Sequence, residues 1–186
     1  MEFQEVINKR HSIREYETKQ IPKSILKKLI INAGKAPSAK NEQPWNFYVI
    51  TNKKKRDYLS NILHKEFNKI SKKEKLSPNL IKIASKFYQN MGNAPNIIFV
   101  YSNNKEFNKI VSISCAIENL MLSATALGLG TCWIGTFKDK EKEISKLLNI
   151  PNNKELIASI IIGYPKKGYV PLKRDKKKLN EICKLI

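Results

Sequence analysis

Short, strongly apolar segments alternate with longer amphipathic ones along the chain. Of all features of the sequence, this alternation most restricts the folds that the chain can adopt. Residues 46–51, 96–102 and 156–163 are rich in aromatic and β-branched side chains and are bounded by turn residues, which is typical of buried strands. These segments are far too short to cross a bilayer. We therefore expect buried strands in a protein that has no membrane partner.

Apolar residues recur three or four positions apart between these strands, which is the spacing of one helix face. The pattern predicts helices over residues 22–34, 54–65, 79–91, 110–127 and 140–148. Pro22 near the start of the first helix and Gly34 at its end are common at helix boundaries. Within residues 66–78 the charged run from Lys72 to Lys75 interrupts the pattern, so we expect a mobile connection or a frayed helix end there. The combination predicts a mixed α and β class.

The length of 186 residues suits one compact domain, and 41% hydrophobic content is enough for a sizeable core. We expect residues 1–186 to form a single domain. The first residues, Met1 to Glu5, are acidic and lack the basic and then apolar pattern of a secretory signal. We therefore expect a cytoplasmic location.

Cysteine and histidine are scarce, with three and two residues respectively. Cys115, Cys132 and Cys183 are far apart and form no Cys-x-x-Cys pair, so we expect free thiols. His11 and His64 have no second histidine or cysteine pair at metal-binding spacing. We expect no metal site.

The formal net charge of +19 could attract nucleic acid, anionic lipid or phosphorylated ligands. The lysines are spread along the whole chain beside abundant asparagine and isoleucine, as the codon bias of a low-GC genome would produce. The aromatic residues mostly lie in apolar periodic segments rather than with the positive charge. We expect no nucleic-acid partner, and keep a basic nucleic-acid-binding protein as an alternative.

Two segments carry side chains suited to a polar ligand. Residues 36–45, APSAKNEQPW, connect a predicted helix to a predicted strand, yet hold two prolines, a tryptophan and spaced polar side chains. Residues 10–14, RHSIR, place two guanidinium groups and a hydroxyl on alternate positions, which in an extended segment project to one side at about 7 Å per two residues. Such a trio suits a phosphate monoester, because arginine forks bind its oxygens bidentately. A solvated surface is the alternative.

A third segment, residues 126–135 (ALGLGTCWIG), ends a predicted helix with glycines and starts a strand that closes with another glycine. Glycine lets a flat ligand approach the backbone closely. A helix C-cap followed by a core strand is the alternative.

Together these segments resemble, in order and separation, those of the flavin-dependent nitroreductase family, and the resemblance covers nearly the whole chain. It rests on residues 10–14, 36–45, 116–120, 128–135 and 163–165, of which the second and fourth are the most specific. The absence of a long insertion after Glu118-Asn119 is similar to the compact branch of the family. Ser112 departs from the pattern, since many relatives have an aspartate that opens this helix.

The resemblance implies an α+β fold with a central mixed, mainly antiparallel sheet flanked by helices. It also implies a homodimer with FMN at the interface and a C-terminal segment that reaches over the partner. Each subunit would then lend residues to the cofactor site of the other.

The implied contacts fall into groups according to the part of FMN that they touch. The phosphate is bound by Arg10 and Ser12, with a backbone contact from His11, and Lys173 and Arg174 complete its site. Arg14 lies near the pyrimidine edge of the ring. The loop contributes Pro37, Ser38 and Ala39 from the other subunit, Asn41 and Gln43 toward the ribityl chain or ring, and Pro44-Trp45 as an anchor to the core. The ring's other edge is lined by Trp133, Ile134 and Gly135.

The implied activity is an FMN-dependent NAD(P)H oxidoreductase. Hydride passes from NADH or NADPH to flavin N5, and a small oxidised acceptor such as a nitroaromatic, a quinone or an enal-like compound then takes the place of nicotinamide. No side chain acts as nucleophile or base, whereas Arg14 and the backbone of Gly135 tune the flavin. A non-catalytic flavin-binding or storage protein remains an alternative, and the fold does not decide the acceptor.

Overall fold

The computed structural model describes residues 1–73, 77–172 and 175–186, and its centre is a four-stranded sheet. The strands are β1 (Asn46–Ile50), β2 (Asn96–Ser102), β3 (Gly130–Ile134) and β4 (Glu155–Gly163), in the spatial order β1-β2-β4-β3. Every pairing between these strands is antiparallel. Across the described residues, parallel pairing is confined to one isolated bridge, between Ser12 and Thr131.

Strand β2 is buried along its whole length, which explains its uninterrupted apolar sequence. Phe99 and Tyr101 face one core cluster, whereas Ile98 and Val100 face the other. Successive side chains of a strand point to opposite faces, so two cores form on the two sides of the sheet. Both faces therefore need a cover of helices.

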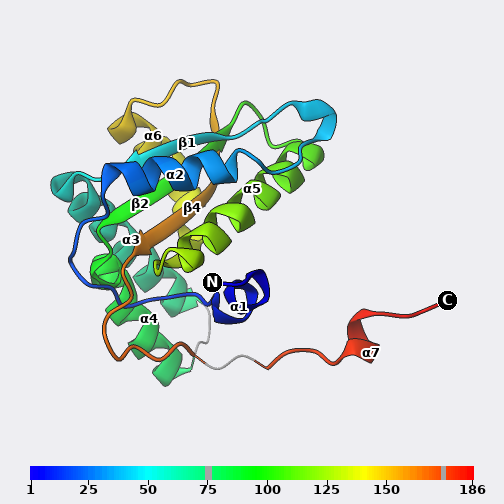
Figure 1. Ribbon diagram of the computed structural model, residues 1–186. Helices are drawn as coiled ribbons and strands as arrows, with labels where there is room; N and C mark the ends of the chain where they lie inside the picture. Colours follow the sequence, from blue (N-terminus) through cyan, green and yellow to red (C-terminus); the bar gives the residue numbers. More distant parts are fainter. Residues whose placement is uncertain (74–76, 173–174) are drawn as a thin grey trace.

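Helices α2 (Lys23–Ala33) and α5 (Phe107–Ala126) cover one face of the sheet (Figure 1). Helices α3 (Lys53–Lys73), α4 (Pro78–Asn90) and α6 (Glu141–Leu148) lie on the opposite side. Helix α1 (Phe3–Lys9) lies beside α5 (Figure 1). The α+β class, the mainly antiparallel sheet and the helical flanks are as the resemblance predicted.

The predicted connection over residues 66–78 is wrong for residues 66–73, because α3 continues to Lys73. Phe67 is buried, and its ring lies 4.7 Å from that of Tyr88 on α4, measured between centroids. Glu66 is ion-paired with Lys69 at 2.8 Å and with Lys140 at 3.1 Å. These contacts with α4 and with the segment before α6 hold the helix where the sequence pattern weakens. Residues 74–76 lie outside the described part of the chain.

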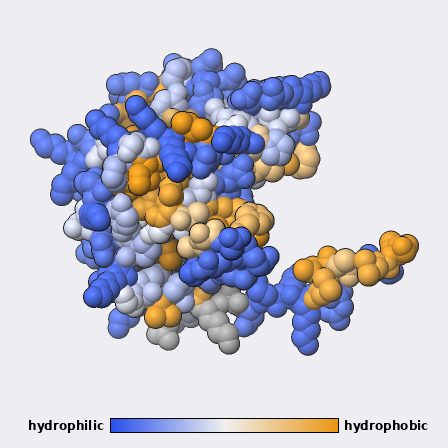
Figure 2. Space-filling view, viewed as in Figure 1, coloured by the Kyte–Doolittle hydropathy of each residue, from blue (hydrophilic) through white to orange (hydrophobic). Residues whose placement is uncertain are grey.

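Short 3₁₀ turns and a C-terminal segment complete the chain. The turns are η1 (Ala39–Asn41), η2 (Met91–Asn93) and η3 (Thr136–Lys140). The C-terminal segment with α7 (Leu179–Ile182) extends away from the body of the molecule (Figure 1) and carries apolar side chains into solvent (Figure 2). Of the helices that the structure describes, none combines the length and apolarity needed to cross a membrane.

Candidate functional site

The segment from Arg10 to Arg14 is extended and follows the end of α1. Ile13 donates its backbone N–H to the Thr131 carbonyl at 2.9 Å, which fixes the segment beside the edge strand β3. The Ile13 side chain is buried against Gly130, where a Cβ would lie only 2.5 Å from Ile13 Cγ1. Gly130 is therefore needed for the packing of this segment, as the alternative of a core strand after the helix cap implies for this glycine.

The far end of this segment is fixed by Tyr16 and Gly92. Tyr16 is fully buried, its hydroxyl donates to the Ile13 carbonyl at 2.6 Å, and its N–H donates to the Gly92 carbonyl at 2.8 Å. Burial raises the pKa of Tyr16 well above its ordinary value, so the phenol stays a neutral donor. Gly92 has a φ of 62°, and a Cβ there would lie 2.1 Å from the Arg14 carbonyl oxygen. The backbone of Arg14 is thus held tightly against η2.

A cavity of about 310 Å³ lies along the exposed side of this segment. Its lining includes the predicted phosphate ligands Arg10, His11 and Ser12 together with Arg14. Arg14 also lines a neighbouring cavity of about 420 Å³, which Arg10 does not reach. The two arginines therefore occupy different places, with Arg10 at the first cavity alone and Arg14 between the two.

Two charged residues that the sequence did not assign to the site also line the first cavity, Glu118 and Lys176. Glu118 Oε1 lies 3.4 Å from Arg10 Nε, which makes an ion pair at the inner nitrogen of the guanidinium. Glu118 belongs to the quoted motif of residues 116–120, but no sequence spacing pairs it with Arg10. Lys173 and Arg174 lie outside the described residues, so Lys176 is the cation that the structure shows on that side.

The loop from Pro37 to Gln43 has an unusual backbone. Lys40, Asn41 and Gln43 have φ values of 52°, 55° and 47°, in the left-handed region that residues other than glycine and asparagine seldom adopt. Ser38 Oγ accepts a hydrogen bond from Gln43 N at 3.1 Å, and Gln43 Nε2 donates to Asn41 Oδ1 at 3.2 Å. Trp45 packs against the core on the α2 side of the sheet, which confirms the predicted anchor. A strained loop held by its surroundings is common at functional sites.

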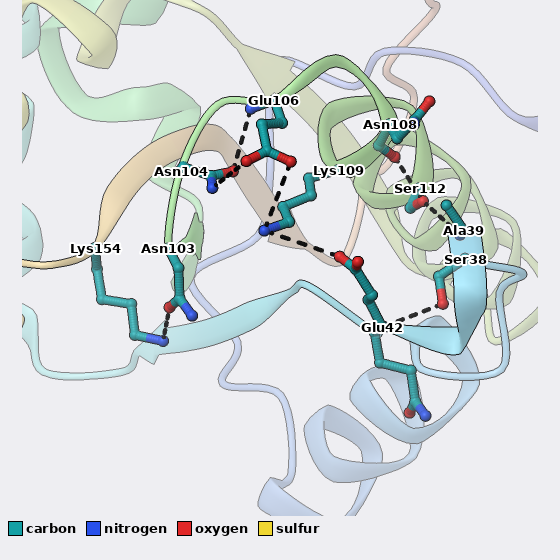
Figure 3. A network of polar contacts seen from close by, with 11 residues as sticks. Ser38, Ala39, Glu42, Asn103, Asn104, Glu106, Asn108, Lys109, Ser112 and Lys154 are labelled. Atoms are coloured by element: carbon teal, nitrogen blue, oxygen red, sulfur yellow. Dashed lines mark hydrogen bonds and ion pairs between the residues drawn. The ribbon is translucent and has the colours of Figure 1, made fainter.

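This loop is attached to the first turns of α5 (Figure 3). Ala39 N donates to Ser112 Oγ at 3.3 Å, and Glu42 lies 3.8 Å from Lys109 Nζ. Ser112 does not open the helix, because α5 begins at Phe107. The predicted start of this helix at residue 110 is therefore three residues too late.

The cavity residues and the loop do not meet within one chain. The cavity reaches α5 at Glu118 and Leu122, whereas the loop reaches it at Ser112, which lies six and ten residues, or roughly 9 and 15 Å, away along the helix. In the described part of the chain, no residue of 37–43 lines that cavity. The cavity and the loop are therefore separate places on the surface of one chain.

The end of β3 supplies the third predicted group. Trp133 is 42% exposed, whereas Ile134 is buried in the core on the α3 side. Gly135 is exposed, and a Cβ there would meet nothing within 4 Å. This strand end can therefore be approached by a ligand, unlike Gly130. Among the described residues no group of His, Cys, Asp or Glu could hold a metal ion.

Comparison with known proteins identifies the class to which this fold and site belong. Residues 7–164 match the model of the nitroreductase family, and the chain belongs to that family. A protein of Archaeoglobus fulgidus, provisionally named as an NADH dehydrogenase/NAD(P)H nitroreductase, is 31% identical over 87% of this chain and 84% of its own. The predicted family is thereby confirmed.

Two further relatives show the range of the family. The crystal structure of a nitroreductase with bound FMN from Bacteroides fragilis is 27% identical, covers 100% of both chains and has a TM-score of 0.80. Iodotyrosine deiodinase 1 of Sus scrofa is 27% identical over 97% of this chain and 67% of its own. The names of these relatives differ in the compound that they act on.

Proposed function

We propose that this protein is an FMN-dependent NAD(P)H oxidoreductase that works as a homodimer and reduces a small oxidised acceptor. One observation carries the proposal: a chain of the nitroreductase family presents a cationic cavity and a strained polar loop as two half-sites. The FMN-bound relative from Bacteroides fragilis supports the choice of cofactor. Residues 1–186 act as a single domain in this proposal.

The donor groups around the first cavity fit the phosphate end of FMN. Arg10 and Ser12 bind phosphate oxygens, His11 contributes through its backbone, and Lys173, Arg174 and Lys176 add positive charge. Glu118 holds Arg10 through Nε, which keeps the outer nitrogens of the fork for a bidentate contact. Arg14, between the two cavities, faces the pyrimidine edge of the ring.

The remaining contacts are to the ribityl chain and ring. Asn41 and Gln43 offer amide groups, while Pro37, Ser38 and Ala39 bring the loop backbone close to the ring. The open backbone at Gly135, with Trp133 and Ile134, borders the opposite edge. Bound FMN supplies two-electron redox chemistry between NADH or NADPH and the acceptor, in a ping-pong sequence. The side chains bind and orient, Arg14 stabilises negative charge, and none acts as nucleophile or base.

The homodimer follows from the separation of the half-sites and from exposed apolar surface. On α5, Phe107 and Val111 are 79% and 46% exposed. On the C-terminal segment, Leu179 and Leu185 are 74% and 93% exposed. Apolar side chains on a segment that leaves the body suit a second copy of the chain, so that the C-terminal segment covers the partner.

The visible spectrum of the purified protein tests this function. We expect a flavin spectrum that bleaches on addition of NADH or NADPH without oxygen, and regains its colour when an acceptor is added. A panel of nitroaromatics, quinones and enals then identifies the acceptor class. A flavin spectrum that neither pyridine nucleotide bleaches would indicate a storage protein, and a protein that takes up no FMN would contradict the proposal.

A further inference from the structure

The loop of residues 37–43 depends on contacts outside itself for its shape. The left-handed conformations of Lys40, Asn41 and Gln43 cost free energy, and they persist where surrounding contacts hold them. The bonds within the loop, such as Ser38 Oγ with Gln43 N, close it but do not fix its place on the protein. Its placement comes from Trp45, which anchors the end of the loop to the core, and from its attachment to α5 near the left-handed residues.

Ser112 is the buried part of this attachment. Its side chain is 5% exposed, and its hydroxyl donates to the Asn108 carbonyl at 2.7 Å. Because the single hydroxyl hydrogen is used there, the oxygen is left as an acceptor, and it receives the Ala39 N–H at 3.3 Å (Figure 3). A backbone carbonyl of α5 is thus linked through one hydroxyl to a backbone amide of the loop.

Lys109 provides a second, weaker attachment. Its Nζ lies 3.8 Å from Glu42 and 3.9 Å from Glu106, and the two carboxylate side chains are 45% and 67% exposed. Exposed ion pairs at such distances contribute little and are screened by salt. The hydrogen bond at Ser112 is part-buried and directional, and its acceptor lies on a buried residue, so it fixes the backbone of the loop more closely than the exposed ion pair does.

We propose that Ser112 is a positioning residue, which holds Ala39 so that the loop is already in its flavin-binding conformation before the cofactor arrives. The proposal rests on the proposed function, since it requires that the loop contact FMN. Ser112 acts through Ala39 and not by contact with the cofactor. Loss of the hydroxyl should therefore weaken the contacts of the loop with the ring and ribityl chain, while the contacts with the phosphate stay in place.

The test is a set of three variants, Ser112→Ala, Ser112→Thr and Ser114→Ala. Ser114 is a matched control, since its hydroxyl donates to the Ile110 carbonyl at 2.9 Å, which is the same kind of bond on the same helix, and this bond does not involve the loop. Dissociation constants for FMN and riboflavin, and the visible circular dichroism of the bound flavin, are measured for each. Urea midpoints show that the variants are folded.

We expect Ser112→Ala to weaken FMN and riboflavin binding by the same factor, about three- to tenfold, and to alter the visible circular dichroism. Ser112→Thr keeps the hydroxyl and should restore binding, while Ser114→Ala should match the wild type. Equal binding by Ser112→Ala and Ser114→Ala, or a loss for FMN alone, would overturn the role of Ser112 and leave the proposed function intact. A wild-type protein that binds neither flavin would overturn both.

Discussion

Arg10 and Arg14 are four residues apart in an extended segment, but they serve different parts of the proposed site. Arg10 borders one cavity and is ion-paired with Glu118, whereas Arg14 borders two cavities and has its backbone held against Gly92. Arg10 is therefore placed to bind the phosphate and Arg14 to face the ring. Substitutions at the two positions should have different effects.

Replacing Arg10 by alanine should weaken FMN binding about ten- to a hundredfold, because a charge-assisted contact to phosphate contributes roughly 1.5–3 kcal/mol. Riboflavin has no phosphate and should bind as it does to the wild type. Titrations of both flavins measure the difference. Lys167→Ala, which removes an exposed charge away from the cavity, controls for the general field of the basic protein. Equal FMN affinity in Arg10→Ala and wild type would place the phosphate elsewhere.

Replacing Arg14 by glutamine should lower the midpoint potential of the bound flavin, because a positive charge at the pyrimidine edge stabilises the reduced state. Each 1.4 kcal/mol of lost stabilisation corresponds to roughly 30 mV for two electrons. Oxidised FMN should bind almost unchanged. Reduction by NAD(P)H should slow, and electron delivery to the acceptor should slow less or become faster. Spectroelectrochemistry measures the potential, and an unchanged potential with weakened binding would assign Arg14 to the phosphate.

At the scale of single residues, the sequence predicted several side chains that line the cavity, but it did not predict which residues contact them. The segment that carries Arg10, Ser12 and Arg14 is extended as expected, because the alternation of its side chains depends only on neighbouring residues. The Glu118 contact with Arg10 joins α5 to the chain after α1 and has no local signal. The packing role of Gly130 was not predicted, because a sequence does not show that Ile13 fills the space above it. The roles of Lys173 and Arg174 stay predictions.

Helix α5 is the element that organises both half-sites. Its first turns hold the loop through Ser112 and Lys109, and its middle holds Arg10 through Glu118. It also packs on the sheet through Ile113, Ile117 and Leu120, which are fully buried. The positions of the two half-sites relative to the core are therefore set by one rigid helix.

The contact between β3 and the Arg10–Arg14 segment gives a prediction for stability. A Cβ at Gly130 would lie 2.5 Å from Ile13 Cγ1 and 2.8 Å from Ile13 Cβ, so Gly130→Ala must displace a buried side chain. We expect a loss of about 1–3 kcal/mol in the free energy of unfolding, measured in urea, together with weaker FMN binding. Gly135→Ala should keep wild-type stability, because nothing lies within 4 Å of its Cβ. A Gly130→Ala protein as stable as Gly135→Ala would contradict this packing argument.

Elements with strong local patterns were predicted, and elements that depend on distant contacts were not. Strands β1, β2 and β4 and helix α2 fall close to their predicted ranges. The end of α3 was not predicted, because this part of the helix is stabilised by the contact of Phe67 with Tyr88 of α4. A contact with a distant helix has no local signal, whereas the charged run from Lys72 to Lys75 suggested that the helix had already ended. The left-handed residues Met91 and Asn93 were also not predicted, since they flank Gly92, whose conformation depends on its contacts with the distant backbones of Arg14 and Tyr16.

At the scale of the whole molecule, we propose that two copies of the chain share each flavin site. The family could be predicted from motifs in a characteristic order, because these motifs extend over nearly the whole sequence. The match of the nitroreductase family model to residues 7–164 confirms it. The pairing of half-sites could not be derived from residue patterns, because it depends on how two surfaces meet. The exposed apolar residues of α5 and of the C-terminal segment show where such surfaces lie.

Complementation between two inactive subunits tests this claim most directly. One subunit carries Arg10→Ala, and the other carries Asn41→Gly with Gln43→Gly, which removes both amides while glycine tolerates the positive φ values. Each variant alone should bind FMN weakly. The coexpressed heterodimer, purified through two different tags, should regain one tight FMN site per dimer, because an intact Arg10 then meets an intact loop across the interface. A heterodimer with no tight site, whose weak sites match those of the two homodimers, would show that each site lies within one chain and would contradict the account.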